Sequence, residues 1–254
     1  MPAPINPLKQ RLAAGEVLHG MWVGMADPYA AEMAATAGFD WLLIDGEHAP
    51  NDLRSLSAQL AVVQNSPSHP VVRLPVGDPV LVKQALDIGA QTLLIPMVET
   101  GDQAEMLVRA TRYPPHGFRG VGSSLARASR FAAIPDYLKT ANDQICLILQ
   151  VESVKALDAL DDILAVEGVD GVFIGPSDLA ADMGYLGNTS EPKVRAAVHD
   201  ALRRIRAAGK FAGVLATSDD FIASCKDAGA TFVGVGIDVL LFVSAMRDLA
   251  KKYR

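Results

Sequence analysis

Short apolar runs alternate along the whole chain with segments whose apolar residues recur at helical spacing. The apolar runs are typical of buried strands, and we expect them at His19–Met25, Trp41–Asp45, Val71–Leu74, Thr92–Val98, Ile145–Val151, Gly171–Ile174, Phe211–Leu215 and Phe232–Gly236. The segments between and after them predict helices over Tyr29–Ala37, Asp52–Gln64, Leu81–Ile88, Asp102–Tyr113, Val154–Val166, Val194–Ala208, Asp219–Ala228 and Val239–Tyr253. Left-handed glycines are expected to end four of these helices, at Gly38, Gly89, Gly209 and Gly229.

This alternation favours one particular fold class. Strands that are apolar on both faces and separated by helices form parallel sheets covered by helices. Eight such units in 254 residues predict an α/β protein with a single (β/α)8 TIM barrel over residues 1–254. A doubly wound open sheet is the alternative. Its glycine-rich dinucleotide turn is missing after the first strand, where the chain reads Gly24-Met25-Ala26-Asp27.

Composition narrows the class further. Half of the residues (50%) are hydrophobic, and the net charge is −6. The negative charge argues against a nucleic-acid partner. We expect no membrane association, because no apolar run is long enough to span a bilayer. The start Met1–Asn6 lacks the features of a signal peptide. We therefore expect a cytoplasmic protein in which Cys146 and Cys225 are buried, reduced thiols.

Acidic residues follow two of the expected strands. Glu152 comes directly after Ile145–Val151, and Asp178 follows Gly171–Ile174. In a barrel both lie at the C-terminal strand ends, where the chemistry of this fold is found, and carboxylates suit hard divalent ions. Two exposed loop carboxylates are the alternative, and Glu152 also suits the N-terminus of the next helix. Gln150 lies on the same strand face as Glu152 and favours the metal site.

A histidine and an arginine join this rim. His48, in Asp45-Gly46-Glu47-His48, is a candidate general base, metal ligand or surface residue. Arg73 ends a short apolar strand, where a guanidinium needs a buried anion. That anion is either a protein carboxylate or an oxygen of the substrate.

Two loops leave alternatives open. Gly175-Pro176-Ser177-Asp178 turns a strand into a helix, either as a plain helix cap or with backbone N–H groups that bind a substrate carboxylate. The long glycine-rich stretch after Tyr113 carries basic residues that either bind a distal acidic group or serve a subunit interface. These residues are Arg119, Arg127 and Arg130.

The lysines argue against covalent chemistry. A Schiff-base lysine needs a desolvated position inside a strand. Lys210 precedes the seventh strand at the wrong end, and Lys155 lies past the fifth strand. No nucleophile elbow, phosphate-binding loop or Cys/His zinc cluster is present either.

Several ordered motifs resemble the HpcH/HpaI aldolase family of class II, divalent-metal pyruvate aldolases. The motifs are Leu42–Asn51, Val72–Pro75, Gln150–Ser153 and Gly171–Gly184. The resemblance runs from Gly20-Met21-Trp22 to Val235-Gly236-Ile237-Asp238 and so covers nearly the whole chain. It implies a TIM barrel assembled as a homohexamer, with the C-terminal helix exchanged between paired subunits.

The resemblance also assigns roles to single residues. It implies that Glu152 and Asp178 bind Mg²⁺, Mn²⁺ or Co²⁺, that Arg73 contacts the pyruvate oxygen, and that His48 is an acid/base residue oriented by Asp87. Further substrate contacts are expected from Trp22, Gln150, Gly175, Pro176, Ser177 and Leu215.

The implied reaction is reversible cleavage of a 4-hydroxy-2-oxo acid to pyruvate, or an analogue such as hydroxypyruvate, and an aldehyde. A related metal-dependent lyase acting on acyl-CoA or oxaloacetate is the alternative. A catalytically silent barrel that binds an oxo-acid is a third. Ser153, where threonine is commoner, and Tyr185–Ser190 depart from the pattern of the family and leave the aldehyde open.

Overall fold

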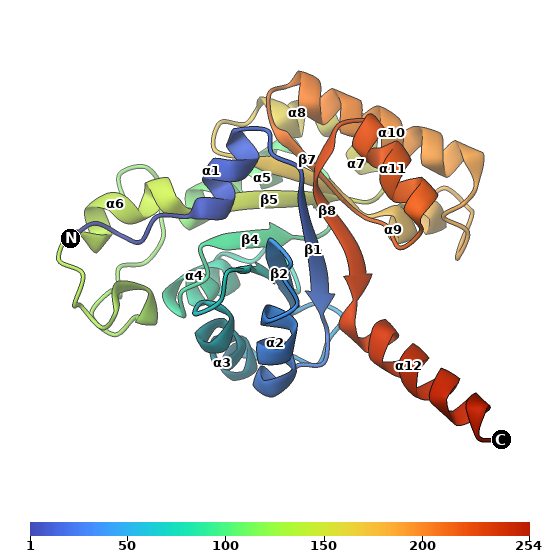
Figure 1. Ribbon diagram of the computed structural model, residues 1–254. Coiled ribbons are helices and arrows are strands. Elements are labelled where there is room, and N and C mark those ends of the chain that lie inside the picture. Colours follow the sequence, from blue (N-terminus) through green and yellow to red (C-terminus); the bar gives the residue numbers. More distant parts are fainter.

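The computed structural model describes all 254 residues and has eight parallel strands in a closed barrel (Figure 1). Neighbouring strands follow one another in sequence order, and β8 pairs with β1. The single-domain TIM barrel is therefore confirmed, and the open sheet is excluded. The strands are β1 (Leu18–Val23), β2 (Trp41–Asp45), β3 (His69–Arg73), β4 (Thr92–Ile95), β5 (Cys146–Val151), β6 (Gly171–Ile174), β7 (Phe211–Leu215) and β8 (Ala230–Ile237).

Helices surround this barrel (Figure 1). They are α1 (Pro7–Ala13), α2 (Pro28–Ala35), α3 (Leu53–Val63), α4 (Pro79–Asp87), α5 (Gly101–Thr111), α6 (Tyr137–Gln144), α7 (Val154–Asp158), α8 (Leu160–Ala165), α9 (Pro176–Asp182), α10 (Pro192–Ala207), α11 (Asp219–Asp227) and α12 (Asp238–Lys252), with a 3₁₀ turn η1 (Arg127–Ser129).

Local sequence signals explain where many helices begin and end. Asp27, Asp52 and Asp78 accept backbone N–H groups at the starts of α2, α3 and α4, which satisfies donors that have no partner inside the helix. Helices α2, α4, α10 and α11 are each followed within three residues by a left-handed glycine, as expected for Gly38, Gly89, Gly209 and Gly229.

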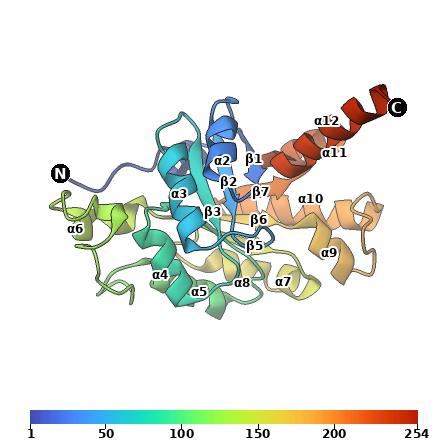
Figure 2. The same cartoon turned by 90° about the horizontal axis from the view of Figure 1, so that it is seen from below.

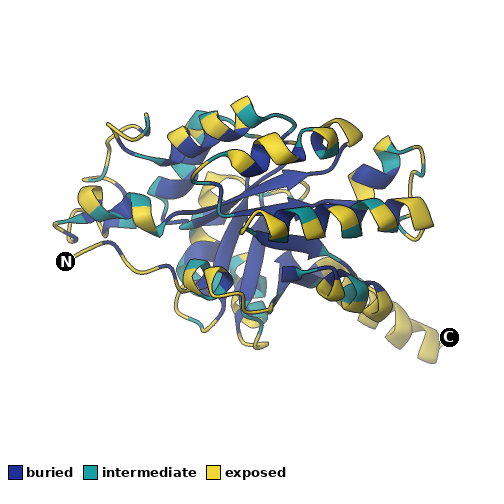
Figure 3. Ribbon diagram, turned by 90° about the horizontal axis from the view of Figure 1, so that it is seen from above, coloured by how far each residue is buried: buried dark blue, intermediate teal, exposed yellow.

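Two apolar layers hold the barrel together. The larger lies between the strands and the surrounding helices, and the smaller fills the barrel interior. Inside, the rings of Trp41 and Phe232 stack with centroids 3.9 Å apart. Figure 3 shows the resulting buried sheet beneath helices that are buried on one side and exposed on the other.

Several helical elements differ from the expectation. Helix α1 was not expected, although its Leu8 and Leu12 join the interior cluster and close the N-terminal end of the barrel. Helix α6 was not expected either. The single helix expected over Val154–Val166 is divided into α7 and α8 around Ala159. Short helices with few apolar positions carry too weak a periodic signal to be found in this way.

Helix α12 leaves the barrel and extends away from it (Figures 1 and 2). Its apolar side chains, which include Leu240, Leu241, Phe242 and Leu249, are exposed. Exchange of this helix between subunits stays a prediction. None of the helices is both long enough and apolar enough to cross a membrane.

The first residue of β3 provides a pH-dependent test of the fold. His69 Nε2 lies 3.0 Å from Thr92 Oγ1, and burial lowers the pKa of His69 to about 4. The unfolded chain, with a histidine pKa near ~6.5, therefore binds more protons between these values, and stability falls as the pH drops through this window.

We predict that acidification from pH 8 to pH 5 costs the native chain about 2 kcal/mol at this residue, and that His69→Gln removes this loss. Urea unfolding at several pH values measures the effect, with the exposed His116→Gln as control. Parallel pH profiles for all three proteins would contradict the assignment.

Candidate active site

An ion pair joins the C-terminal ends of β2 and β3. Asp45 and Arg73 are the last residues of the two strands and lie side by side in register. Arg73 Nε donates to Asp45 Oδ1 at 2.8 Å, and Nη2 donates to Oδ2 at 2.6 Å. Burial alone would raise the pKa of Asp45, but the hydrogen bonds and charge of Arg73 lower it below its usual value. The expectation of a buried anion beside Arg73 is met by a protein carboxylate.

A second carboxylate contacts the same guanidinium. Arg73 Nη1 lies 2.8 Å from Glu47 Oε2. Burial raises the pKa of Glu47, although the charge of Arg73 acts in the opposite direction. Glu47 belongs to the rim motif but was not singled out as a site residue. The sequence feature that points to Glu47 is its position two residues after Asp45, the last residue of β2. Because Glu47 lies in the loop after the strand, the direction of its side chain depends on the geometry of that loop.

Glu152 directly follows β5, and hydrogen bonds hold both oxygens of its buried carboxylate. The residue is only 3% exposed, and its Oε1 accepts a hydrogen bond of 3.0 Å from the backbone N–H of Met97. Gln150 Nε2 donates to Glu152 Oε2. Met97 adopts a left-handed conformation with φ of 55°, and this local turn accompanies its contact with the carboxylate.

The charge state of Glu152 is sensitive to its surroundings. The pKa of Glu152 is raised to about 7, mainly by burial and also by the charges of Asp178 and Glu47, whereas the hydrogen bonds from Gln150 and Met97 act to lower it. Three carboxylates therefore influence one another at this rim. The cost of keeping them ionised together falls when a cation lies among them.

Asp178 reaches the rim from the first turn of α9 and is exposed. Gly175, one residue before this helix, lies against Glu152. A Cβ atom at Gly175 would lie 2.4 Å from Glu152 Oε2 and 3.2 Å from Gln150 Nε2. Only glycine therefore leaves the carboxylate in its place. Pro176 is buried beside it, whereas Ser177 is exposed.

These residues fit a hard divalent ion. Gln150 Oε1 is buried without a hydrogen-bond partner, and Glu152 offers carboxylate oxygens that such ions prefer. The side chains of His, Cys, Asp and Glu do not form a group of three at metal-binding distance. Mg²⁺ typically needs only one or two carboxylates, with water and substrate oxygens completing its shell.

Trp22 and Leu215 lie at the same mouth of the barrel. Both would contact a Cβ atom at Gly234, Trp22 at 2.6 Å and Leu215 at 3.0 Å. The guanidinium of Arg73 lies 5.8 Å from the centroid of the Trp22 ring. The expected substrate-facing residues on β1 and β7 are thus brought together with Arg73.

His48 and Asp87 are not brought together within the chain. The His48 side chain follows β2, is 69% exposed, and its Nε2 lies 3.9 Å from Glu47 Oε2. Asp87 ends α4, at the N-terminal end of the barrel before β4. It accepts a hydrogen bond of 2.7 Å from Nη2 of the fully buried Arg119. The Asp87 of one chain therefore does not orient its own His48.

The three arginines of the long loop also separate. Arg119 donates a hydrogen bond to Asp87 and lies over the ring of Tyr113, with 4.4 Å between the guanidinium carbon and the ring centroid. Arg127 and Arg130 line a cavity at the N-terminal end of the barrel. None of the three reaches the rim that carries Arg73 and Glu152 in this chain.

A (β/α)8 barrel with carboxylates, an amide and an anchored arginine at its C-terminal rim defines an enzyme of the TIM-barrel class. Residues 18–245 match the family model described as HpcH/HpaI aldolase/citrate lyase. The chain belongs to this family and is an aldolase, a carbon–carbon lyase.

Individual relatives agree with this assignment. A hydroxypyruvate/pyruvate aldolase of Roseovarius nubinhibens is 62% identical, over 100% of this chain and 99% of the relative. A 2-keto-3-deoxy-L-rhamnonate aldolase of Escherichia coli O1:K1 is 56% identical, over 95% of this chain and 90% of the relative. The crystal structure of a family protein from Burkholderia cenocepacia J2315 is 43% identical with a TM-score of 0.94, covering 98% of this chain and 99% of that one.

We predict that Asp45→Asn lowers the free energy of unfolding by about 2–3 kcal/mol, because it removes one partner of a buried ion pair. Asp161→Asn is the control, since Asp161 pairs with Arg204 but is 78% exposed and should change stability by less than about 0.5 kcal/mol. Chemical denaturation of both variants measures the difference. Equal stabilities would show that the pair at the rim contributes nothing to the fold.

Proposed function

We propose that the chain is a divalent-metal-dependent aldolase that reversibly cleaves 4-hydroxy-2-oxo acids to pyruvate, or hydroxypyruvate, and an aldehyde. The observation that carries the proposal is the buried Glu152, held beside Gln150 at the same barrel mouth as Arg73. The activities of the relatives, hydroxypyruvate/pyruvate aldolase and 2-keto-3-deoxy-L-rhamnonate aldolase, support the substrate class. A cytoplasmic location belongs to the same proposal.

Glu152 and Asp178 would hold the ion, which is Mg²⁺, Mn²⁺ or Co²⁺. When bound, it supplies a Lewis acid that polarises the 2-oxo group of the substrate. Gln150 would turn its unpartnered Oε1 toward this site. Gly175 keeps the space in front of Glu152 open, and Ser177 lies at the adjoining start of α9.

Arg73 would stabilise the negative charge that develops on the 2-oxo oxygen during cleavage. Such preorganised donors contribute because they need no rearrangement when the charge forms. Asp45 fixes the guanidinium through two hydrogen bonds. Of the five N–H groups of Arg73, those not directed at Asp45 and Glu47 remain for the substrate.

His48 would move the proton. In cleavage its Nε2 accepts the proton of the C4 hydroxyl, and in synthesis it returns this proton to the aldehyde oxygen. Its exposed position at the rim permits such a contact with a bound substrate. Trp22 and Leu215 would pack against the substrate and exclude water from the mouth of the barrel.

We predict that Glu152→Gln weakens Mn²⁺ binding by more than about tenfold, because a neutral amide is a poor ligand for hard divalent ions. Arg73→Ala and His48→Ala should instead keep the metal and lose about 10²–10³-fold in kcat. Calorimetric Mn²⁺ titration and an aldol assay with hydroxypyruvate separate the two effects. The exposed Glu105→Gln serves as control.

Unchanged Mn²⁺ affinity in Glu152→Gln would remove this residue from the ligand set. Near-normal turnover in a folded Arg73→Ala variant would refute its role at the 2-oxo oxygen.

The pairing of His48 with Asp87 would form between subunits. The two residues lie at opposite ends of one barrel. The Asp87 carboxylate is held by its hydrogen bond from Arg119. The Asp87 oxygen lies 4.0 Å from a Cβ position on Gly122, in a loop whose Val121 and Leu125 are exposed. Such apolar side chains suit a subunit contact, and the proposed homohexamer would place Asp87 of the partner subunit beside His48.

We predict that inactive His48→Ala and Asp87→Asn variants regain about one quarter of native activity when their subunits are mixed at random in a closed oligomer. Each restored site combines the His48 of one chain with Asp87 of the partner subunit. Mixing His48→Ala with Arg73→Ala is the control, because both belong to the rim of one chain. Restoration in the control alone, or in neither mixture, would contradict the pairing.

Helix α12 would bind the partner by exchange. It projects from the barrel with an exposed apolar face, and an amphipathic helix normally buries such a face. We predict that the double substitution Phe242→Lys and Leu249→Lys, at exposed positions two turns apart on one face of the helix, lowers the molar mass measured by light scattering. Lys251→Ala with Lys252→Ala, on the same helix, should leave the mass unchanged. Equal masses in both variants would show that α12 does not hold the assembly together.

A further inference from the structure

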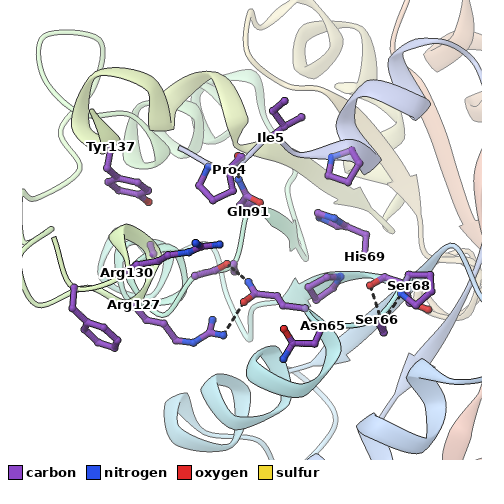
Figure 4. A pocket seen from close by; sticks show the side chains of 18 residues that line it. Pro4, Ile5, Asn65, Ser66, Ser68, His69, Gln91, Arg127, Arg130 and Tyr137 are labelled. Carbon is purple, nitrogen blue, oxygen red and sulfur yellow. Dashed lines mark hydrogen bonds between the residues drawn. The ribbon is translucent and has the colours of Figure 1, made fainter. Parts of the chain in front are cut away.

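A cavity of about 500 Å³ opens at the N-terminal end of the barrel, at the opposite end from Arg73 and Glu152 (Figure 4). Its walls come from five separate segments. They are the stretch up to the start of α1, the connection from α3 to β3, the connection from α4 to β4, the region of η1, and the start of α6. The proposed aldolase reaction uses none of these residues.

The lining of this cavity is cationic. Arg127 and Arg130 are the charged side chains that contribute to it, and no aspartate or glutamate does. Arg127 donates to Ile88 O at 3.1 Å and to Gln64 Oε1 at 2.7 Å, and both acceptors are uncharged. Burial lowers the pKa of Arg127, with no carboxylate acting against it. A partly buried guanidinium without a counter-ion is costly and favours the binding of an anion.

The turn that carries the two arginines is held by backbone hydrogen bonds. Arg130 ends η1 in a left-handed conformation with φ of 52°, and Phe131 and Ala132 follow with φ of 56° and 66°. Hydrogen bonds of 3.1 Å fasten this turn, from Phe131 N to Ala126 O and from Ile134 N to Ser129 O. Figure 4 shows both side chains extending into the cavity from the same side.

Neutral hydrogen-bonding groups surround the rest of the space. Asn65 and His69 lie on the wall facing the arginines, and Gln91 and Tyr137 border the upper part in Figure 4. Amide, imidazole and hydroxyl groups can donate to or accept from the hydroxyl and carboxyl oxygens of a small molecule. The volume lies in the range of cavities that take small ligands.

We propose that this cavity is a second ligand site, which binds a small molecule carrying a phosphate ester or two carboxylates. Two planar guanidinium groups from one turn match the paired oxygens of such dianions. The site differs from the proposed active site in position and in having no carboxylate of its own.

The test is calorimetric titration of the metal-free protein with inorganic phosphate, and separately with succinate, in chloride buffer. We expect saturable binding of at least one probe, weakened about tenfold or more in Arg127→Gln/Arg130→Gln because two charge-assisted contacts are lost. Arg203→Gln is the control, since it removes the same charge from an exposed position on α10. Arg73 stays intact in every variant, so binding at the rim does not affect the comparison.

A single Arg130→Gln variant shows whether loss of binding in the double variant results from misfolding, because it keeps the hydrogen bonds of Arg127. We expect this single substitution to weaken binding several-fold. Preference for phosphate would identify the phosphate-ester class, and preference for succinate the dicarboxylate class. Absence of saturable binding for both probes in the native protein would overturn the proposal. So would equal affinity in the native, single and double variants.

Discussion

Barrel closure is the constraint on which the site depends. Eight parallel strands in sequence order bring all their C-terminal ends to one rim, so residues separated by more than a hundred positions become neighbours. Arg73 and Asp45 meet there because β2 and β3 pair in a register that places one strand end beside the other. Glu152 and Gln150 arrive from β5, and Gly175 from the end of β6. Asp45, Arg73 and Gln150 are thus positioned by backbone pairing within the sheet, whereas Glu152 and Gly175 directly follow the ends of β5 and β6.

The charges at this rim are unbalanced in the chain alone. Asp45, Glu47, Glu152 and Asp178 contribute carboxylates, and Arg73 alone among the buried residues there contributes a positive charge. Asp45 and Glu47 share that charge, whereas Glu152 is buried with only neutral donors and has a raised pKa. A divalent cation between Glu152 and Asp178 would balance them. The same arrangement leaves N–H groups of Arg73 for a substrate oxygen, so the metal and the arginine would act on one small oxo-acid from two sides.

Much of the fold could be predicted from the sequence because the strand signal is strong. The bounds expected for β2, β6 and β7 equal those of the structure, since each is a short apolar run that begins directly after a charged residue. Helix α1 was missed because Leu8 and Leu12 alone give no period, although they close the barrel. The rim residues could be named from the strand ends. The contacts that these and other charged residues make could not be predicted. Asp87 pairs with Arg119, 32 residues away, and Arg127 and Arg130 face a cavity built from five segments. Such contacts depend on tertiary packing, which a local pattern does not contain.

The central claim is that this rim stabilises the enolate of pyruvate with the help of a divalent ion. The most direct measurement is exchange of the pyruvate C3 protons in D₂O, followed by NMR with Mg²⁺ or Mn²⁺ and then with EDTA. The account predicts exchange that requires the metal and that Glu152→Gln and Arg73→Ala abolish. Exchange that persists at full rate after complete removal of the metal would contradict it.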